Sequence, residues 1–497
     1  MNAPFPHPIM PAKVQPLKGQ STVFARQMQV LRYHWDGLTP GDLRRICGLI
    51  EESTQLLANQ NNLPRIEAAF AVAACLFTGR RLSDLSTLRY SRIAYWPDAD
   101  YVALGLVRCA ENWGWYLPAG LPGERTAHDP RGGTDKNLWI QAPDIVRELA
   151  ILTLRARGLS QTSDAPIFSS SLNDLRASAK SLLKSDSGIR RAGTTLEAVE
   201  RWLFGAIVLT AGGDAALAQF VTGNTPFKSK TTSSYTGCTQ DQVENVWHRA
   251  MTQVMPVKPR RAPHTGLRVQ RYGTMFCPDD ADLAVLRNKL TAALQNAASP
   301  DGYHSALTHY TVVLSMLGMA VRPAHYPVLP YDGIDPATGF IVVEDDRQQD
   351  PFMSRLGWAP PVVRTQLAIY RSHLSRLANS KHGAALAAIR STQPNHLAIT
   401  QIEHGVLRSV TLYEVVKDIK KVHKIKLKEN FARHFLRTKL LGKCSTETLQ
   451  ALMGHWNQGT DPSGRGSGFD PLLYRADLER TLPELLDQHG WSALGAA

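Results

Sequence analysis

Four residues in the second half of the 497-residue chain carry side chains suited to chemistry on a phosphate group. Arg322 lies in the run LGMAVRPAHYPVL, and Arg433 lies in the run ENFARHFLRTKLL. His455 follows Arg433 by 22 residues, and Tyr474 follows His455 by 19. Arginine presents a planar fork of N–H donors that holds two phosphate oxygens at once. Two such forks stabilise the charge that develops on a phosphate during phosphoryl transfer.

A tyrosine beside such a clamp is a suitable nucleophile. Attack on a phosphodiester joins the phenol oxygen to phosphorus, and the new bond conserves the energy of the broken one, so that another hydroxyl can rejoin the strand. A histidine in the same site can hydrogen-bond the phosphate or the phenol. The four residues therefore predict a strand-cleaving and strand-joining chemistry that uses no metal, ATP or other cofactor.

The first half of the chain carries a matching series. Its members are an arginine after a Thr-Gly pair, an arginine early in a helix, an asparagine after a glycine, and a tyrosine: Arg81, Arg201, Asn224 and Tyr235. Arg201 precedes Asn224 by 23 residues, close to the 22 that separate Arg433 from His455. Arg81 and Arg322 are 241 residues apart, and the two tyrosines are 239 apart. These intervals indicate two diverged copies of one domain.

The expected elements repeat in the same order. Helical periodicity runs from about residue 28 to 88, short alternating runs lie between 93 and 140, and helices return from 146 to 247. Helices are expected again from about 280 to 317, followed by the strand-like run GFIVVEDD and helices to the end. The sequence therefore predicts an α+β fold that is mostly α-helical, with a small antiparallel sheet in each half.

Three runs resemble motifs of the tyrosine recombinases, the phage integrase family of type IB DNA breaking and joining enzymes. TGRRLSDL resembles the first motif, and RHFLRTKLL and LQALMGHW resemble the second and third. The resemblance implies that Arg322, Arg433 and His455 hold the scissile phosphate and that Tyr474 attacks it to give a 3′-phosphotyrosyl link. It further implies double-stranded DNA as substrate, a homotetramer on two DNA sites, and a role in site-specific recombination or integration of a mobile genetic element.

With this resemblance the chain divides into four parts. Residues 1–25 are expected to be a disordered arm, and residues 26–250 a diverged integrase-like domain that serves as a DNA clamp. Residues 251–279 form a basic linker rich in Pro and Arg, and residues 280–497 form the catalytic domain. The residues of the first copy, Arg81, Arg201, Asn224 and Tyr235, are a second or relic site.

The chain departs from the family pattern at three positions. Where the family's H-x-x-R motif has histidine, the first copy has Ala198 and the second has Asn430. His434 and Arg437 form a literal alternative to that motif, but the downstream spacing favours Arg433. Asn224 stands in place of the motif histidine in the first copy. The second copy is therefore the expected active site, and Tyr474 its expected nucleophile.

The family's sheet lysine has no clear counterpart. Arg347 in VEDDRQQDPFMSR is one substitute, and the first copy offers Lys136 or nothing. Arg347, Asn430 and Trp456 are accordingly predicted to support catalysis. These departures keep two alternatives open, a catalytically inactive DNA-binding or regulatory homologue and a type IB topoisomerase.

Composition agrees with a DNA-binding protein. The formal charge is +13 and the pI is near 9.5, which favours a polyanionic partner. A lysine-rich run just before Arg433 is predicted to contact the DNA backbone through Lys417, Lys420, Lys421, Lys424, Lys426 and Lys428. The six cysteines are scattered without metal-ligand spacing, and no apolar run reaches the length of a membrane span. A cytoplasmic location without a membrane partner or metal is expected.

Overall fold

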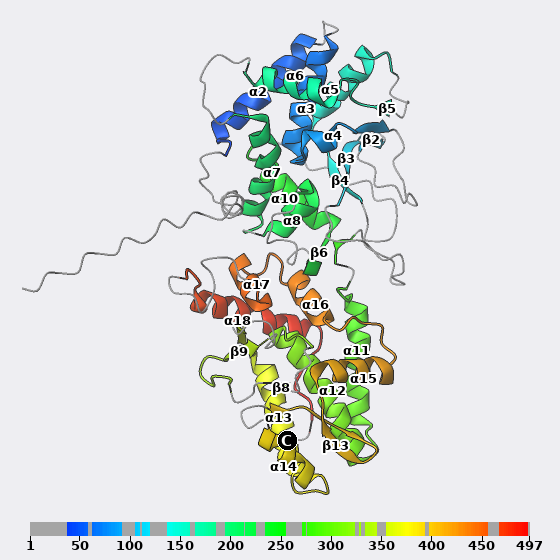
Figure 1. Cartoon of the computed structure of the whole chain (residues 1–497), viewed down its shortest axis with the longest axis vertical. Coiled ribbons are helices and arrows are strands. Elements are labelled where there is room, and N and C mark those ends of the chain that lie inside the picture. Colours follow the sequence, from blue (N-terminus) through cyan, green and yellow to red (C-terminus); the bar gives the residue numbers. More distant parts are fainter. Residues whose placement is uncertain are drawn as a thin grey trace, which may run out of the picture.

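The structure is a computed structural model of the whole chain (Figure 1). It describes residues 37–57, 62–91, 105–109, 112–119, 137–159, 165–184, 194–212, 214–224, 234–254, 271–274, 276–323, 328–329, 333–344, 354–392, 397–455 and 467–495. The predicted arm at residues 1–25 lies outside these ranges.

The first half combines helices with one mixed sheet. Its helices are α2 (Pro40–Leu57), α3 (Leu63–Thr78), α4 (Leu82–Leu85), α5 (Asp144–Ala156), α6 (Leu172–Lys184), α7 (Leu196–Thr210), α8 (Ala215–Thr222) and α10 (Gln240–Met251). Its strands are β1 (Arg89–Ser91), β2 (Gly105–Cys109), β3 (Asn112–Pro118), β4 (Asn137–Gln141) and β5 (Ala165–Pro166), in the sheet order β4-β3-β2-β1-β5. All neighbours pair antiparallel except β1 and β2, which are parallel.

Among its described residues, the second half has only two-stranded sheets, and its longest helix has 20 residues against 18 in the first half. Its helices are α11 (Asp280–Gln295), α12 (Pro300–Met319), α13 (Pro361–Leu377), α14 (Gly383–Thr392), α15 (Leu412–Val422), α16 (Phe431–Lys439), α17 (Thr446–Met453) and α18 (Pro471–Gln488). Its strands are β8 (Val328–Leu329), β9 (Phe340–Glu344), β10 (Ser354–Trp358), β11 (Leu397–Ala398), β12 (Thr400–Glu403) and β13 (Val406–Ser409). The pairs β9–β10, β8–β11 and β12–β13 are all antiparallel.

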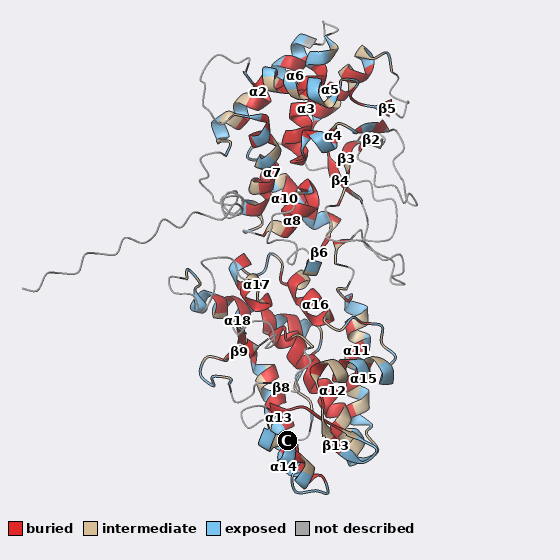
Figure 2. Ribbon diagram, viewed as in Figure 1, coloured by how far each residue is buried: buried red, intermediate tan, exposed pale blue. Residues whose placement is uncertain are grey.

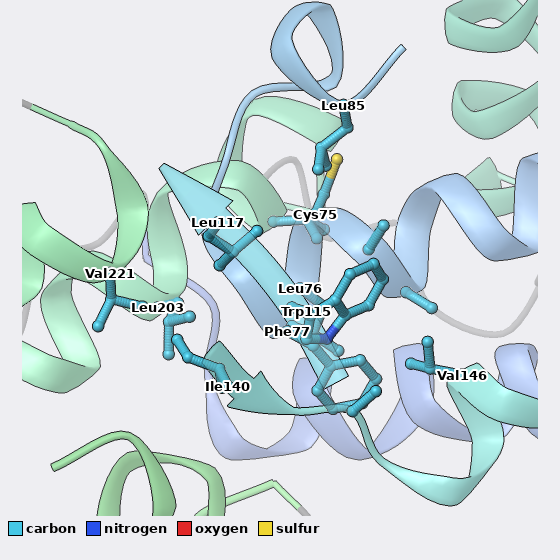
Figure 3. Packing of buried hydrophobic residues seen from close by; sticks show 14 of the residues in the cluster. Cys75, Leu76, Phe77, Leu85, Trp115, Leu117, Ile140, Val146, Leu203 and Val221 are labelled. Atoms are coloured by element: carbon cyan, nitrogen blue, oxygen red, sulfur yellow. The ribbon is translucent and has the colours of Figure 1, made fainter. Parts of the chain in front are cut away.

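Each half has its own hydrophobic core. One cluster of buried residues runs from Leu43 to Tyr272 and the other from Leu283 to Trp491. Figure 2 shows these buried residues as two separate groups along the long axis. In the first half, Trp115 and Leu117 of β3 lie close to Phe77 and its neighbours on α3 (Figure 3). Fully burying one large apolar side chain contributes about 1.5–3 kcal/mol, so each core can hold its own half together.

The prediction of a mostly helical α+β chain with small sheets is confirmed. One detail differs within the segment predicted as a linker. Residues 271–273 form strand β7 (Arg271–Gly273), which pairs antiparallel with β6 (Gly237–Thr239) and buries Tyr272 in the first core. Among the described residues, no helix combines the length and apolar character needed to cross a bilayer.

Two kinds of helix end are repeated between the halves, and they place the predicted site residues. Helix α3 ends at Gly79 and α12 ends at Ala320, both in the left-handed conformation, with φ of 63° and 53°. Arg81 and Arg322 each lie two residues beyond such an end. The left-handed turn points the chain away from the helix axis, so each arginine leaves its helix at the same place.

The ends of α8 and α17 form the second repeated pair. Helix α8 ends at Gly223 and α17 at Gly454, with φ of 71° and 65°. Asn224 and His455 are the residues that follow these glycines. Glycine adopts the left-handed region without a steric penalty, so this stop also fixes where the next side chain lies. Asn224 and His455 thus follow helix ends of the same kind in the two halves.

Candidate functional site between the two halves

The first half places a tyrosine against the second half's predicted site. Tyr235 precedes β6, and β6 lies beside α16 at the junction between the halves (Figure 1). The side-chain amide of Asn430 donates a hydrogen bond to the Tyr235 hydroxyl over 3.2 Å. The Tyr235 ring stacks on His434 at 4.4 Å between ring centroids and lies 5.5 Å from the His455 ring. Three residues from two motifs of the second half therefore surround a phenol from the first half.

Arg433 lies under the same ring. Its guanidinium carbon is 5.4 Å from the centre of the Tyr235 ring, a cation–π distance. Its side chain is fully buried, at 0% exposure. One terminal nitrogen donates to the carbonyl of Ala320 over 3.0 Å, and the other donates to the carbonyl of Met453. Arg433 thereby ties together the ends of α12 and α17, the ends from which Arg322 and His455 emerge.

Each of these two helix ends has a defined turn. The carbonyl of Ala320 belongs to a non-glycine residue in the left-handed region, a conformation that costs about 1 kcal/mol or more per residue. At the end of α17, the His455 backbone N–H donates to the carbonyl of Gln450 over 2.8 Å, which closes the turn after Gly454. Both predicted phosphate-binding residues, Arg322 and His455, are partly exposed.

A second buried arginine near this cluster, Arg355, is not among the residues predicted from the sequence. Arg355 on β10 is 1% exposed and donates to the carbonyls of Met319 and Ala320 over 3.1 and 2.9 Å. It shares the Ala320 carbonyl with Arg433, so it is a sheet cation next to the cluster. The sequence run considered for the sheet lysine, VEDDRQQDPFMSR, ends on Arg355. Arg347, the residue chosen from that run, lies outside the described residues, as do Lys136 and Trp456.

Tyr474 occupies a different environment from Tyr235. It lies in the first turns of α18, is 1% exposed and belongs to the second hydrophobic core. Its hydroxyl donates to the carbonyl of Leu356 over 2.9 Å, and its ring stacks near Phe340. Burial raises the pKa of the Tyr474 phenol above its ordinary value, and the charge of Arg355 offsets only part of this rise. The expected nucleophile is thus buried with its hydroxyl engaged.

His434 is a neutral part of the site. Its Nδ1 lies 2.8 Å from the hydroxyl of Thr274, which follows β7. Burial, together with the adjacent Arg433 charge, lowers the pKa of His434 from 6.5 to about 3. The ring is therefore uncharged at neutral pH, and it can stack on Tyr235 without adding positive charge.

Three further polar contacts join the halves near this site. Arg437 and Asp214 form an ion pair in which both side chains are 1% exposed. The hydroxyl of Thr446 donates to the carbonyl of Gly212, and the Gly237 backbone N–H donates to the Thr438 hydroxyl over 2.9 Å. Asp214 also accepts from Ala216 N as the N-cap of α8. Arg437, the alternative motif arginine, is thus engaged with the first half, whereas Arg433 faces Tyr235.

The other first-half residues are not gathered in the same way. Arg81 and Arg201 are both exposed, and the Arg201 Nε donates back to the Glu197 carbonyl of its own helix. Asn224 donates to the carbonyl of Gly79 over 3.0 Å, which links the two repeated helix ends. The buried arginine in this region is Arg80, which donates to the Val221 carbonyl over 3.0 Å.

The lysine-rich run lies on the surface. Lys417, Lys421, Lys424, Lys426 and Lys428 are exposed, and Lys420 is partly exposed. Lys420 pairs with Glu429 at 2.7 Å, and the ammonium of Lys428 lies 5.1 Å from the Phe276 ring centre. Helix α15 begins with a Thr411–Glu414 capping box and leads directly toward α16. The run therefore forms a basic surface adjoining the helix that carries Arg433.

In the parts of the chain that the structure describes, no group of three or more His, Cys, Asp or Glu side chains is placed to hold a metal ion. Comparisons with family models, with curated proteins and with solved structures give no match. The contacts around Arg433 and Tyr235 are therefore what a proposed function has to explain.

Proposed function

We propose that this protein is a site-specific DNA recombinase or integrase that cleaves and rejoins double-stranded DNA through a 3′-phosphotyrosyl intermediate. The observation that carries the proposal is the convergence of Arg433, Asn430 and His455 on a tyrosine side chain. In the sequence, Arg433 and His455 belong to the runs that resemble the second and third motifs of the tyrosine recombinases, and Asn430 stands where the second motif has its histidine. A phenol, an arginine fork and a histidine in one place suit attack on a phosphodiester better than they suit a packing role alone.

The chemistry follows from the donors around the phosphate. Arg322 and Arg433 would hold non-bridging oxygens, and His455 would donate a further hydrogen bond. Arg355, on the sheet beside Arg433, would add positive charge where the family has its lysine. Removing one such donor from an oxyanion site typically costs about 10²–10³ in rate.

DNA binding itself is attributed to the lysine surface on and after α15. Its exposed ammonium groups adjoin the site helix, so a duplex bound there runs past the junction between the halves. Contacts of this kind contribute affinity without sequence readout, and they weaken as salt displaces them. A homotetramer on two DNA sites, as the family resemblance implies, remains part of this proposal.

A covalent-capture experiment tests the proposal. Full-length protein is mixed with a pool of nicked duplexes of randomised sequence, in which cleavage releases a short end and traps the protein on DNA. We expect denaturant-resistant adducts from the wild-type protein and none from Arg433→Ala. Arg201→Ala is the matched control, because Arg201 is an exposed arginine early in the corresponding first-half helix.

A second candidate function is a regulatory DNA-binding protein without strand cleavage. It is favoured by the complete burial of Arg433 and by the engagement of the Tyr474 hydroxyl with Leu356. Tight binding to the duplex pool without any adduct would support this candidate and contradict the enzyme. Relaxation of supercoiled plasmid without sequence preference would instead favour a type IB topoisomerase.

A further inference from the structure

Two tyrosines compete for the role of nucleophile, and their surroundings differ sharply. The Tyr474 hydroxyl donates to the Leu356 carbonyl, inside the second core. The Tyr235 side chain is partly exposed, and its hydroxyl accepts from the Asn430 amide, one turn of helix from Arg433. A hydroxyl that accepts a hydrogen bond keeps its own proton available for transfer.

We propose that the two halves share one active site, in which Tyr235 of the first half is the nucleophile served by Arg433 and His455 of the second. This inference rests on the proposed function and changes its central residue. The first half is then no relic, because it contributes the attacking group.

The step balances without another reactant. The Tyr235 phenol oxygen forms a bond to phosphorus, and the bond from phosphorus to the 5′ oxygen of the next nucleotide breaks. The phenolic proton is lost and the leaving oxygen gains one, so the products are a 3′-phosphotyrosyl link and a free 5′ hydroxyl. The Arg433 guanidinium carbon and the centre of the His455 ring lie 5.4 and 5.5 Å from the centre of the Tyr235 ring, so a phosphate bound at the phenol oxygen would lie near both side chains.

The shared site also requires a small movement. The Tyr235 ring covers the Arg433 guanidinium, and both terminal nitrogens of Arg433 donate to backbone carbonyls. An entering phosphate therefore displaces the ring from the guanidinium and takes over hydrogen bonds from Ala320 or Met453. The exchange replaces neutral acceptors with a charged one, which forms the stronger hydrogen bonds.

Contacts beside Tyr235 hold it at this place. The neighbouring Thr236 carbonyl accepts from Thr274 N over 2.9 Å, and the Gly237 N–H donates to Thr438 of α16. A Cβ at Gly237 would lie 3.2 Å from the Thr438 hydroxyl, so the chain passes close to the second half here. The backbone of residues 236–237 is thus fixed on both sides, while the Tyr235 ring extends over the cluster.

Tyr235→Phe tests the inference in the full chain. It removes one hydroxyl and keeps the ring that stacks on His434. We expect covalent capture of the nicked duplex pool to fall at least about a hundredfold, with DNA binding and the thermal unfolding midpoint close to wild type. Tyr303→Phe is the matched control and should capture DNA like the wild-type protein, because Tyr303 lies in the first turn of α12, at the opposite end of that helix from Ala320.

Retained or increased capture by Tyr235→Phe would overturn the inference. If Tyr474→Phe abolished capture at the same time, Tyr474 would be the nucleophile and Tyr235 a cover over Arg433. A wild-type protein that forms no adduct would refute the proposed function itself, which is a distinguishable result. Because Tyr235→Phe leaves the core intact, the test does not depend on whether Tyr474→Phe folds.

Discussion

In both halves an arginine side chain holds two helix ends together, but the arginine comes from a different position in each half. In each half, the helix that precedes the first motif arginine must be held to the helix that ends before Asn224 or His455. The first half uses Arg80, which follows Gly79 and donates to the Val221 carbonyl near the end of α8. The second half uses Arg433 from α16, which donates to Ala320 and to Met453 at the end of α17.

The two halves therefore place different arginines at this joint. In the first half the joint is made by Arg80, next to Arg81, and by the Asn224 amide, which donates to the Gly79 carbonyl, and Arg201 is exposed on its helix. In the second half the joint is made by the motif arginine itself, and the cluster forms around it. Under the proposed function, the same side chain has a structural role and a phosphate-binding role, and the first half adds Tyr235 to that side chain's surroundings.

Arg433→Ala should have the largest effect on covalent capture. A small effect would contradict the difference between the two halves. The substitution removes the fork, leaves the Met453 carbonyl without its arginine donor and leaves Arg355 as the remaining arginine donor to the Ala320 carbonyl, so we expect loss of covalent capture and destabilisation of about 2–4 kcal/mol. Arg433→Lys keeps the charge but loses the paired geometry. Capture assays and urea unfolding measure the two effects separately, and Arg201→Ala should change neither.

The joint between the halves should show its effect on stability rather than on capture. Arg437→Met leaves Asp214 as an unpaired buried charge, which typically costs about 3–5 kcal/mol. Lys439→Met is the control on the same helix, because its pair with Asp280 is partly exposed and is worth less than about 1 kcal/mol. Urea unfolding followed by fluorescence measures both. Equal, small losses in the two variants would show that the halves are not held together by this pair.

Acid should weaken the second half's contact with Tyr235. The pKa of His434 is about 3 in the folded protein and near 6.5 when unfolded, so the unfolded state binds more protons between these values. The contribution of this histidine is present above pH 6.5 and is lost as pH falls below it, by at most about 1.4 kcal/mol per pH unit. Urea midpoints of wild type and His434→Gln at pH 7 and pH 5 provide the check. An identical pH response in both proteins would contradict this assignment.

The lysine surface should give the smallest effect for each residue. Replacing Lys421, Lys424 and Lys426 with Gln removes exposed charges from the second half, and each lost phosphate contact lowers the slope of log affinity against log salt by about 0.9. Fluorescence anisotropy at several salt concentrations measures this slope. Lys180→Gln in the first half, where the ammonium already pairs with Glu197, should leave the slope unchanged. A slope unaltered by the triple replacement would remove these lysines from the interface.

The sequence predicted the elements better than it predicted the contacts. Helical periodicity and the glycines at 79, 223 and 454 predict the helix ends, because glycine readily adopts the left-handed conformation that ends a helix. Tyr235 and Arg433 are 198 positions apart in the sequence. Their contact depends on how the two halves pack together, and hydrophobic periodicity describes only single helices and strands. Arg355 was passed over for a similar reason, because its burial beside Ala320 depends on the pairing of β9 with β10.

The most direct test is to identify the tyrosine that carries DNA in the wild-type protein. The trapped adduct is digested with protease and nuclease, and the peptide that keeps a nucleotide is sequenced by mass spectrometry. A single site shared by both halves predicts the nucleotide on the peptide containing Tyr235. The nucleotide on the peptide containing Tyr474 would contradict the shared site and would return the chemistry to the second half alone.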